Sequence, residues 1–210
     1  MATQTTVAAF LDELASSSPA PGGGSVAALA GALGAALTTM VCAVTIGKKK
    51  YVDVEDDMKK ILRTSEGLRS RFAGLVKEDA AAFTKVMEAY ALPKENDLQK
   101  ALRTAAIQGA TKEATLVPLE VMKHCIDALA LTKEVAEKGN ANSISDAGVG
   151  ALMLHAACEG AALNVKINLA GVTDSEFVGW KSDEVESLLR TSRVMAEETR
   201  SIVAAKMGKR

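Results

Sequence analysis

The chain has 210 residues, a formal net charge of −1 and an apolar fraction of 48%, but only 3% of its residues are aromatic. This near-neutral balance argues against a nucleic-acid-binding protein, which carries a basic face. Small and aliphatic side chains supply most of the apolar residues, and such a composition favours helices over strands. No linker-like stretch divides the sequence. We therefore expect a single all-α domain over residues 1–210.

Cysteine and histidine usage bears on the compartment and on metal binding. Cys42, Cys125 and Cys158 are widely spaced, and no CxxC motif occurs. They indicate buried thiols in a reducing compartment, which predicts a cytoplasmic protein. The two histidines, His124 and His155, have no partner ligands at metal-binding spacing, so no metal site and no cofactor are expected.

The apolar periodicity along the chain predicts an up-and-down bundle of long helices. Helical segments are expected over residues 7–15, 26–46, 54–91, 97–137, 143 or 145 to 170, 174–178 and 182–207. Pro118 should kink the fourth of these helices, because its ring clashes with the preceding turn. Ser182 should cap the last helix.

The predicted helix over residues 26–46 is the centre of the pattern, because no charged residue occurs from position 16 to position 47. A helix that is apolar on every side must be buried. Its small residues make it thin, so that neighbouring backbones approach closely. The stretch is long enough to span a membrane, but it is poor in the large apolar residues that drive insertion. We therefore prefer the central helix of a soluble bundle or oligomer, with no membrane partner.

The two ends of this helix carry the first candidate site residues. Ser25 is a good N-cap, and the free amides at the helix start would attract an anion. The preceding turn is flexible and glycine-rich; the substrate-binding candidates here are Pro21, Gly22, Gly23, Gly24 and Ser25. Lys48 and Lys49 follow the far end, where burial would lower the pKa of a lysine and make it an acid–base group. They are equally consistent with a solvated helix end, next to Tyr51.

Other candidates are polar residues in apolar or small-residue surroundings, whose hydrogen bonds a ligand would complete. Asp79 lies one turn before Phe83 in an alanine-rich stretch, and Asn164 and Asn168 lie one turn apart on an otherwise apolar helix. Gln108, among alanines and a glycine, suits an orienting role. Asn140 and Asp146 flank a predicted helix start, where Asp146 would alternatively form a capping box with Ser143.

Taken together, these motifs resemble the cyclodeaminase/cyclohydrolase family of folate one-carbon metabolism. The matching motifs occur in the family's order over about residues 5–200. They include the glycine-rich turn at 21–25, the basic residues after Gly47, Asp79 with Phe83, Leu92-Pro93-Lys94, Val117-Pro118-Leu119, Gly139-Asn140, Ser145-Asp146 and Asn164 to Asn168. The resemblance implies an all-α cyclodeaminase-type fold and a homodimer with folate sites at the subunit interface. Lys48 to Tyr51 look more like the stand-alone methenyltetrahydrofolate cyclohydrolases than like the cyclodeaminase domains.

The resemblance thus implies hydrolysis of 5,10-methenyltetrahydrofolate to 10-formyltetrahydrofolate. Lys48 or Lys49 would shuttle the proton, Gln108 would orient water, and Asp146 and Asp79 would stabilise cationic groups. The glycine-rich turn, Tyr51 and the three asparagines would bind the substrate. One alternative is a cyclodeaminase that releases ammonia from formiminotetrahydrofolate. Another, of a different class, is a non-catalytic helical oligomer that binds folate.

Overall fold

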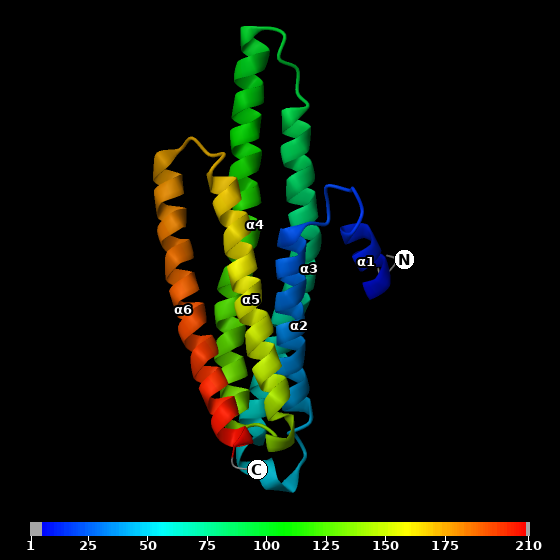
Figure 1. Ribbon diagram of the computed structural model, residues 1–210, viewed down its shortest axis with the longest axis vertical. Helices are drawn as coiled ribbons and strands as arrows, with labels where there is room; N and C mark the ends of the chain where they lie inside the picture. The colour runs from blue at the N-terminus through cyan, green and yellow to red at the C-terminus, as the bar shows by residue number, and fades with distance from the viewer. Residues whose placement is uncertain (1–5, 209–210) are drawn as a thin grey trace.

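The computed structural model describes residues 6–208, an all-helical arrangement in which no strand occurs among these residues. The α-helices are α1 (Val7–Leu14), α2 (Gly23–Ala43), α3 (Glu55–Tyr90), α4 (Asp97–Lys138), α5 (Ile144–Leu169) and α6 (Ser175–Met207); two 3₁₀ turns, η1 (Lys49–Val54) and η2 (Ala141–Ser143), precede α3 and α5. Helices α2 to α6 run up and down as one elongated bundle (Figure 1). The predicted fold class is confirmed, while the outermost residues of the predicted 1–210 domain lie outside the described part.

Two predicted helix starts were wrong, the first because a contact distant in sequence overrides the local signal. Ser25 does not cap α2: the helix begins at Gly23, after Gly22, and the Ser25 hydroxyl instead donates to Asp79. The expected break near Ser182 is absent, since α6 continues from its Asp174 cap to Met207. A single glycine inside a helix costs only about 1 kcal/mol, so Gly179 does not interrupt it. Helix α4 continues through Pro118.

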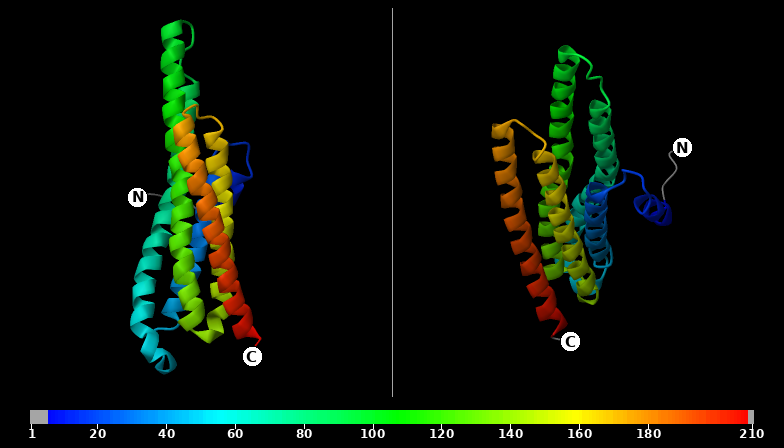
Figure 2. Two further views of the ribbon diagram at one scale, coloured as in Figure 1. Left: turned by 90° about the vertical axis from the view of Figure 1, so that its left-hand side faces the viewer. Right: turned by 45° about the horizontal axis from the view of Figure 1, so that its top comes forward.

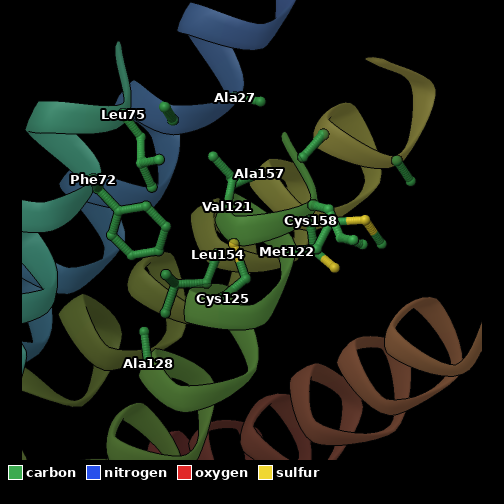
Figure 3. Packing of buried hydrophobic residues seen from close by; sticks show 14 of the residues in the cluster. Ala27, Phe72, Leu75, Val121, Met122, Cys125, Ala128, Leu154, Ala157 and Cys158 are labelled. Atoms are coloured by element: carbon green, nitrogen blue, oxygen red, sulfur yellow. The ribbon is translucent and has the colours of Figure 1, made fainter. Parts of the chain in front are cut away.

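The small residues of α2 let it pack against α3 and α5 at close range. A Cβ at Gly31 would lie 2.6 Å from the ring of Phe72, and one at Gly34 would lie 2.5 Å from Leu154. Phe72 and Leu154 belong to the main core cluster, where they point toward Cys125 (Figure 3). Glycine at positions 31 and 34 therefore sets how closely three helices approach.

One side of α2 is left uncovered in a single chain, so the expectation of burial on every side is met only in part. Val26, Leu33 and Met40 are exposed and recur every seven residues, and Leu33 keeps 50% of its surface. Helix α5, which packs against α2, carries a second uncovered apolar series: Val149, Leu152, Leu163 and Ile167. Residues 23–43 and 141–169 are apolar and long enough to cross a membrane, but the bundle buries about half of each.

Two parts of the chain project from the bundle. The α3–α4 hairpin extends beyond the other helices (Figure 1), and α1 stands apart at the end of an extended segment (Figure 2). No residue of α1 is buried.

Candidate functional site

A cavity of about 320 Å³ opens at the N-terminal end of α2, between the glycine-rich turn and helices α3, α4 and α5. Its lining combines three polar side chains with a largely apolar wall. The lining residues are Pro19, Ala20, Gly22, Gly23, Gly24, Asp79, Ala82, Phe83, Val86, Ala114, Asn164, Ile167 and Asn168. The structure thus brings together candidates that the sequence places in three separate segments: the glycines of the turn at 22–24, Asp79 and the two asparagines of α5, whereas Pro21 and Ser25 lie outside the lining.

Asp79 holds the start of α2. The Ser25 hydroxyl donates a 2.8 Å hydrogen bond to Oδ2 of Asp79, and the backbone of Ser25 also bonds this carboxylate. Burial raises the pKa of Asp79, while the two bonds from Ser25 act in the opposite direction. A carboxylate at a helix N-terminus also faces the positive end of the helix dipole. Asp79 therefore replaces the expected Ser25 cap and presents its remaining lone pairs to the cavity.

Asn168 is positioned by a gap in the hydrogen bonding of α4. Pro118 has no N–H, so the carbonyl of Ala114 one turn earlier loses its helical donor. The side-chain nitrogen of Asn168 donates to that carbonyl at 3.0 Å. Asn164 is fixed in a similar way, since its Nδ2 donates to the Gly160 carbonyl at 2.9 Å. Both amides are thereby oriented at the cavity wall.

The apolar wall was not predicted as part of the site. Phe83 and Val86 follow Asp79 at helical spacing on α3, and Ile167 lies beside Asn164 and Asn168 on α5. The helical spacing of Asp79 and Phe83 in the sequence already indicated that Phe83 lies on the same side of α3 as Asp79. Ile167 is 71% exposed, so it carries the wall out onto the uncovered apolar surface of α5.

A second group of candidates lies at the other end of α2, around η1 and η2. Lys48 and Lys49 are exposed in the single chain, so the burial expected around them is not supplied by their own bundle. The Tyr51 hydroxyl accepts a 3.0 Å hydrogen bond from the N–H of Ala141. Asn140 is buried, and its Nδ2 donates to the Val44 carbonyl at 3.1 Å. Tyr51 and Asn140 thus join α2 and η1 to η2.

The two remaining candidates lie outside the cavity lining. Asp146 is in the first turn of α5, where a negative charge suits the helix dipole, and Ser143 precedes the helix without a side-chain cap bond. Gln108 clamps the α5–α6 loop: its Nε2 donates to the Gly171 carbonyl at 2.8 Å, and its Oε1 accepts from the N–H of Thr173 at 2.8 Å. The side chain of Gln108 therefore has a structural role in this loop.

The glycine-rich turn and Lys48 are separated within one chain by the length of α2. At about 1.5 Å per residue, a helix of this length spans roughly 30 Å. Figure 1 shows the two regions at opposite ends of the α2 ribbon. Among the described residues, no three His, Cys, Asp or Glu side chains gather as metal ligands would.

Comparisons with known proteins agree with this architecture. Residues 6–187 match the family model described as formiminotransferase-cyclodeaminase. The chain is 49% identical to a methenyltetrahydrofolate cyclohydrolase from Methylorubrum extorquens, over 99% of this chain and 100% of that protein. It is 35% identical to the formimidoyltransferase-cyclodeaminase of Rattus norvegicus over 90% of this chain, which spans only 35% of that longer protein.

A solved structure shows the same fold. The crystal structure of formiminotetrahydrofolate cyclodeaminase from Thermotoga maritima superposes with a TM-score of 0.87 at 32% identity, covering 95% of this chain and 96% of that one. The family suggested by the sequence motifs is thereby confirmed. The chain belongs to the formiminotransferase-cyclodeaminase family.

Proposed function

We propose that the protein is a methenyltetrahydrofolate cyclohydrolase, an enzyme that hydrolyses 5,10-methenyltetrahydrofolate to 10-formyltetrahydrofolate. The observation that carries this proposal is the 49% identity over the full length of a relative with that name. The cyclodeaminase relatives are more distant, and most of them are longer proteins of which this chain matches about a third.

The reaction needs two protons removed from water and one delivered to N5, with one proton released overall. Water adds to the electrophilic amidinium carbon between N5 and N10, forming a C–O bond and, after loss of one proton, a neutral tetrahedral intermediate. The C–N5 bond then breaks, N5 leaves with a proton, and the hydroxyl group loses its proton to solvent as the formyl C=O bond forms. A neutral lysine that takes the first proton from water and returns it to N5 serves both steps. We assign this shuttle to Lys48 or Lys49, and the carbon's own positive charge requires no cofactor.

The cavity suits the pterin end of the substrate. Its polar groups are Asp79, Asn164 and Asn168, which together accept and donate hydrogen bonds as an amidine-like ring edge requires. The apolar wall with Phe83 and Ile167 suits the flat faces of the ring. A volume of about 320 Å³ is at the small end of ligand sites, which supports a site that a second chain completes.

A homodimer would bring the two groups of candidates together. Because α2 spans roughly 30 Å, its ends meet only if a second α2 packs antiparallel to the first. The uncovered stripe of Val26, Leu33 and Met40, at seven-residue spacing, provides an apolar seam for such packing. In this arrangement the partner's Lys48 and Lys49 border the cavity and become buried.

The remaining candidates take supporting roles. Tyr51, Asn140 and Asp146 belong to the lysine-bearing end, where Asp146 would stabilise a cationic group. We propose no catalytic role for Gln108, because its amide already holds the α5–α6 loop.

We treat residues 1–210 as one domain. We also expect a cytoplasmic location, since Cys42, Cys125 and Cys158 are all free and buried.

The test is to follow the near-ultraviolet absorbance of 5,10-methenyltetrahydrofolate with purified protein. Hydrolysis should abolish it, and Lys48→Met or Lys49→Met should reduce the rate at least tenfold. Lys60→Met is the matched control: Lys60 is an exposed lysine near the same end of the bundle and should leave the rate unchanged. Full rates in both lysine variants would remove the proposed shuttle.

The same preparation should be given formiminotetrahydrofolate. Ammonia release without hydrolysis of the methenyl compound would establish the cyclodeaminase alternative instead. Binding of either compound without turnover would favour a folate-binding oligomer that lacks catalysis.

A further inference from the structure

Helix α1 has the pattern of a docking element, but the described part of the chain leaves Phe10 and Leu14 only half-buried. Its eight residues place Val7, Phe10, Leu11 and Leu14 at helical spacing on one side. None of its residues is buried, and Leu11 keeps 54% of its surface. The hydrogen bonds of residues 6–18 all end within residues 6–20 of the described chain.

Helix α1 is too short to be stable without packing against another surface. Isolated helices shorter than about 12 residues are marginal in water, so eight residues need a surface to remain helical. The right-hand view of Figure 2 shows α1 standing apart from the bundle. Covering its apolar side with another molecule would supply the missing stabilisation.

The charges of α1 indicate which surface covers it. The helix carries Asp12 and Glu13 and no basic residue, and neither carboxylate has an ion-pair partner in the described chain. The segment that follows α2 begins with the opposite charge: it has three consecutive lysines at 48–50, then Val52 with 66% of its surface exposed, before the acidic residue Asp53. An acidic helix with an apolar side is complementary to a basic segment with an exposed apolar residue.

The segment that connects α1 to α2 also favours docking on the lysine-bearing segment of a second chain. Residues 15–22 lead from α1 directly into the glycine-rich turn, and Pro19 and Ala20 of this connection line the cavity. In the proposed antiparallel dimer, the partner's η1 lies at this end of α2. The proposed partner surface for α1 is thus within reach of the connection.

We propose that α1 is an arm that crosses to a second copy of the chain and docks on that copy's residues 48–52. This inference rests on the proposed dimer and gives α1 a part in the same site. A docked arm holds Pro19 and Ala20 in the cavity wall and covers the exposed side chain of Val52. Undocking should therefore raise KM.

The experiment is chemical cross-linking between two differently labelled chains. Leu11→Cys chains are mixed with Val52→Cys chains, allowed to exchange subunits, and treated with a short bis-maleimide. The native cysteines are all buried and so do not compete. We expect a covalent hetero-dimer as the main product. Because α1 has no buried residue, Leu11→Cys should not unfold the chain.

Trp180→Cys is the matched control for Val52→Cys, because Trp180 on α6 is 65% exposed. Its chains should give at least tenfold less hetero-dimer with Leu11→Cys. Equal yields of cross-linked hetero-dimer at positions 52 and 180, or no cross-link at position 52, would refute the proposed docking of α1.

Turnover of untreated samples separates this inference from the proposed function. An active enzyme without capture at position 52 refutes only the arm. Capture without hydrolysis of methenyltetrahydrofolate supports the arm and refutes the proposed activity.

Discussion

Gly24 packs so closely against Asp79 that a Cβ at position 24 would overlap the Oδ1 atom of the carboxylate. Gly24→Ala should therefore displace Asp79 from the cavity wall. We expect a loss of about 1–3 kcal/mol in the free energy of unfolding, as for other overpacked sites. We also expect at least a tenfold loss in kcat/KM. Urea unfolding and the absorbance assay measure the two effects.

Gly67→Ala is the matched control for this change. Gly67 lies inside α3, and a Cβ there would meet nothing within 4 Å. The substitution should raise stability by about 0.4–1 kcal/mol through the unfolded state and leave activity unchanged. If Gly24→Ala behaved like Gly67→Ala, the close contact with Asp79 would be unimportant.

Burial of Asp79 predicts a pH dependence of stability. Because its pKa is raised in the folded protein, the folded state binds the proton more tightly than the unfolded chain does. The corresponding stabilisation is fully present below the ordinary pKa of 3.8 and is lost as pH rises through the folded pKa. Asp79→Asn removes this titration. The stability of the variant relative to wild type should therefore increase from acid to neutral pH.

Denaturant unfolding at a series of pH values tests this sign directly. Glu176→Gln, in the exposed first turn of α6, is a control that should leave the pH profile as it is. A relative stability of Asp79→Asn that falls as pH rises would mean that the bonds from Ser25 outweigh burial.

The bond from Asn168 to Ala114 predicts coupling between Asn168 and Pro118. Asn168→Ala leaves the Ala114 carbonyl without its donor, which should cost about 1–3 kcal/mol of stability. Pro118→Ala returns an N–H to the helix at the position that can reach this carbonyl. The cost of Asn168→Ala should therefore be smaller in a Pro118→Ala background. A double-mutant cycle measures the difference, and additive effects would show that the two sites are independent.

The uncovered stripe on α2 predicts that one charge abolishes the proposed dimer. Leu33→Lys places an ammonium group in the centre of the stripe, and burying an unpaired charge is strongly unfavourable. Sedimentation should show single chains with unchanged helical content and little activity. Val194→Lys, on an exposed part of α6, should remain like wild type. A fully active single chain after Leu33→Lys would contradict an interface site.

The sequence contained most of the fold because the helical periodicity is long and uninterrupted. The start of α2 was predicted wrongly because Ser25 is the best cap nearby in sequence. The group that bonds Ser25 is Asp79 of α3, more than fifty residues away. The pairing of Asn168 with Ala114 was equally invisible, although Pro118 marks where a carbonyl needs another donor.

The sequence indicated the polar candidates that line the cavity, but neither its apolar wall nor the grouping of those candidates in space. Asp79, Asn164 and the glycine-rich turn meet at one cavity, as their polar character in apolar surroundings suggested. The length of α2 separates them from Lys48, so one chain holds only part of the proposed site. The hydrogen bonds of Gln108 to the α5–α6 loop could not be predicted, because a polar residue among alanines suits an orienting role and a loop clamp equally well.

The most direct test of a site shared between two chains is to mix two variants that we expect to be inactive, Asp79→Asn and Lys49→Met, with Lys48→Met in the second place if Lys48 proves to be the shuttle. In a mixed dimer, one site would combine an intact Asp79 with an intact Lys49 from the partner. Random pairing should then restore about a quarter of wild-type hydrolysis, because half the dimers are mixed and each has one intact site. If subunits exchange and the mixture stays as inactive as its components, Asp79 and Lys49 do not meet across an interface.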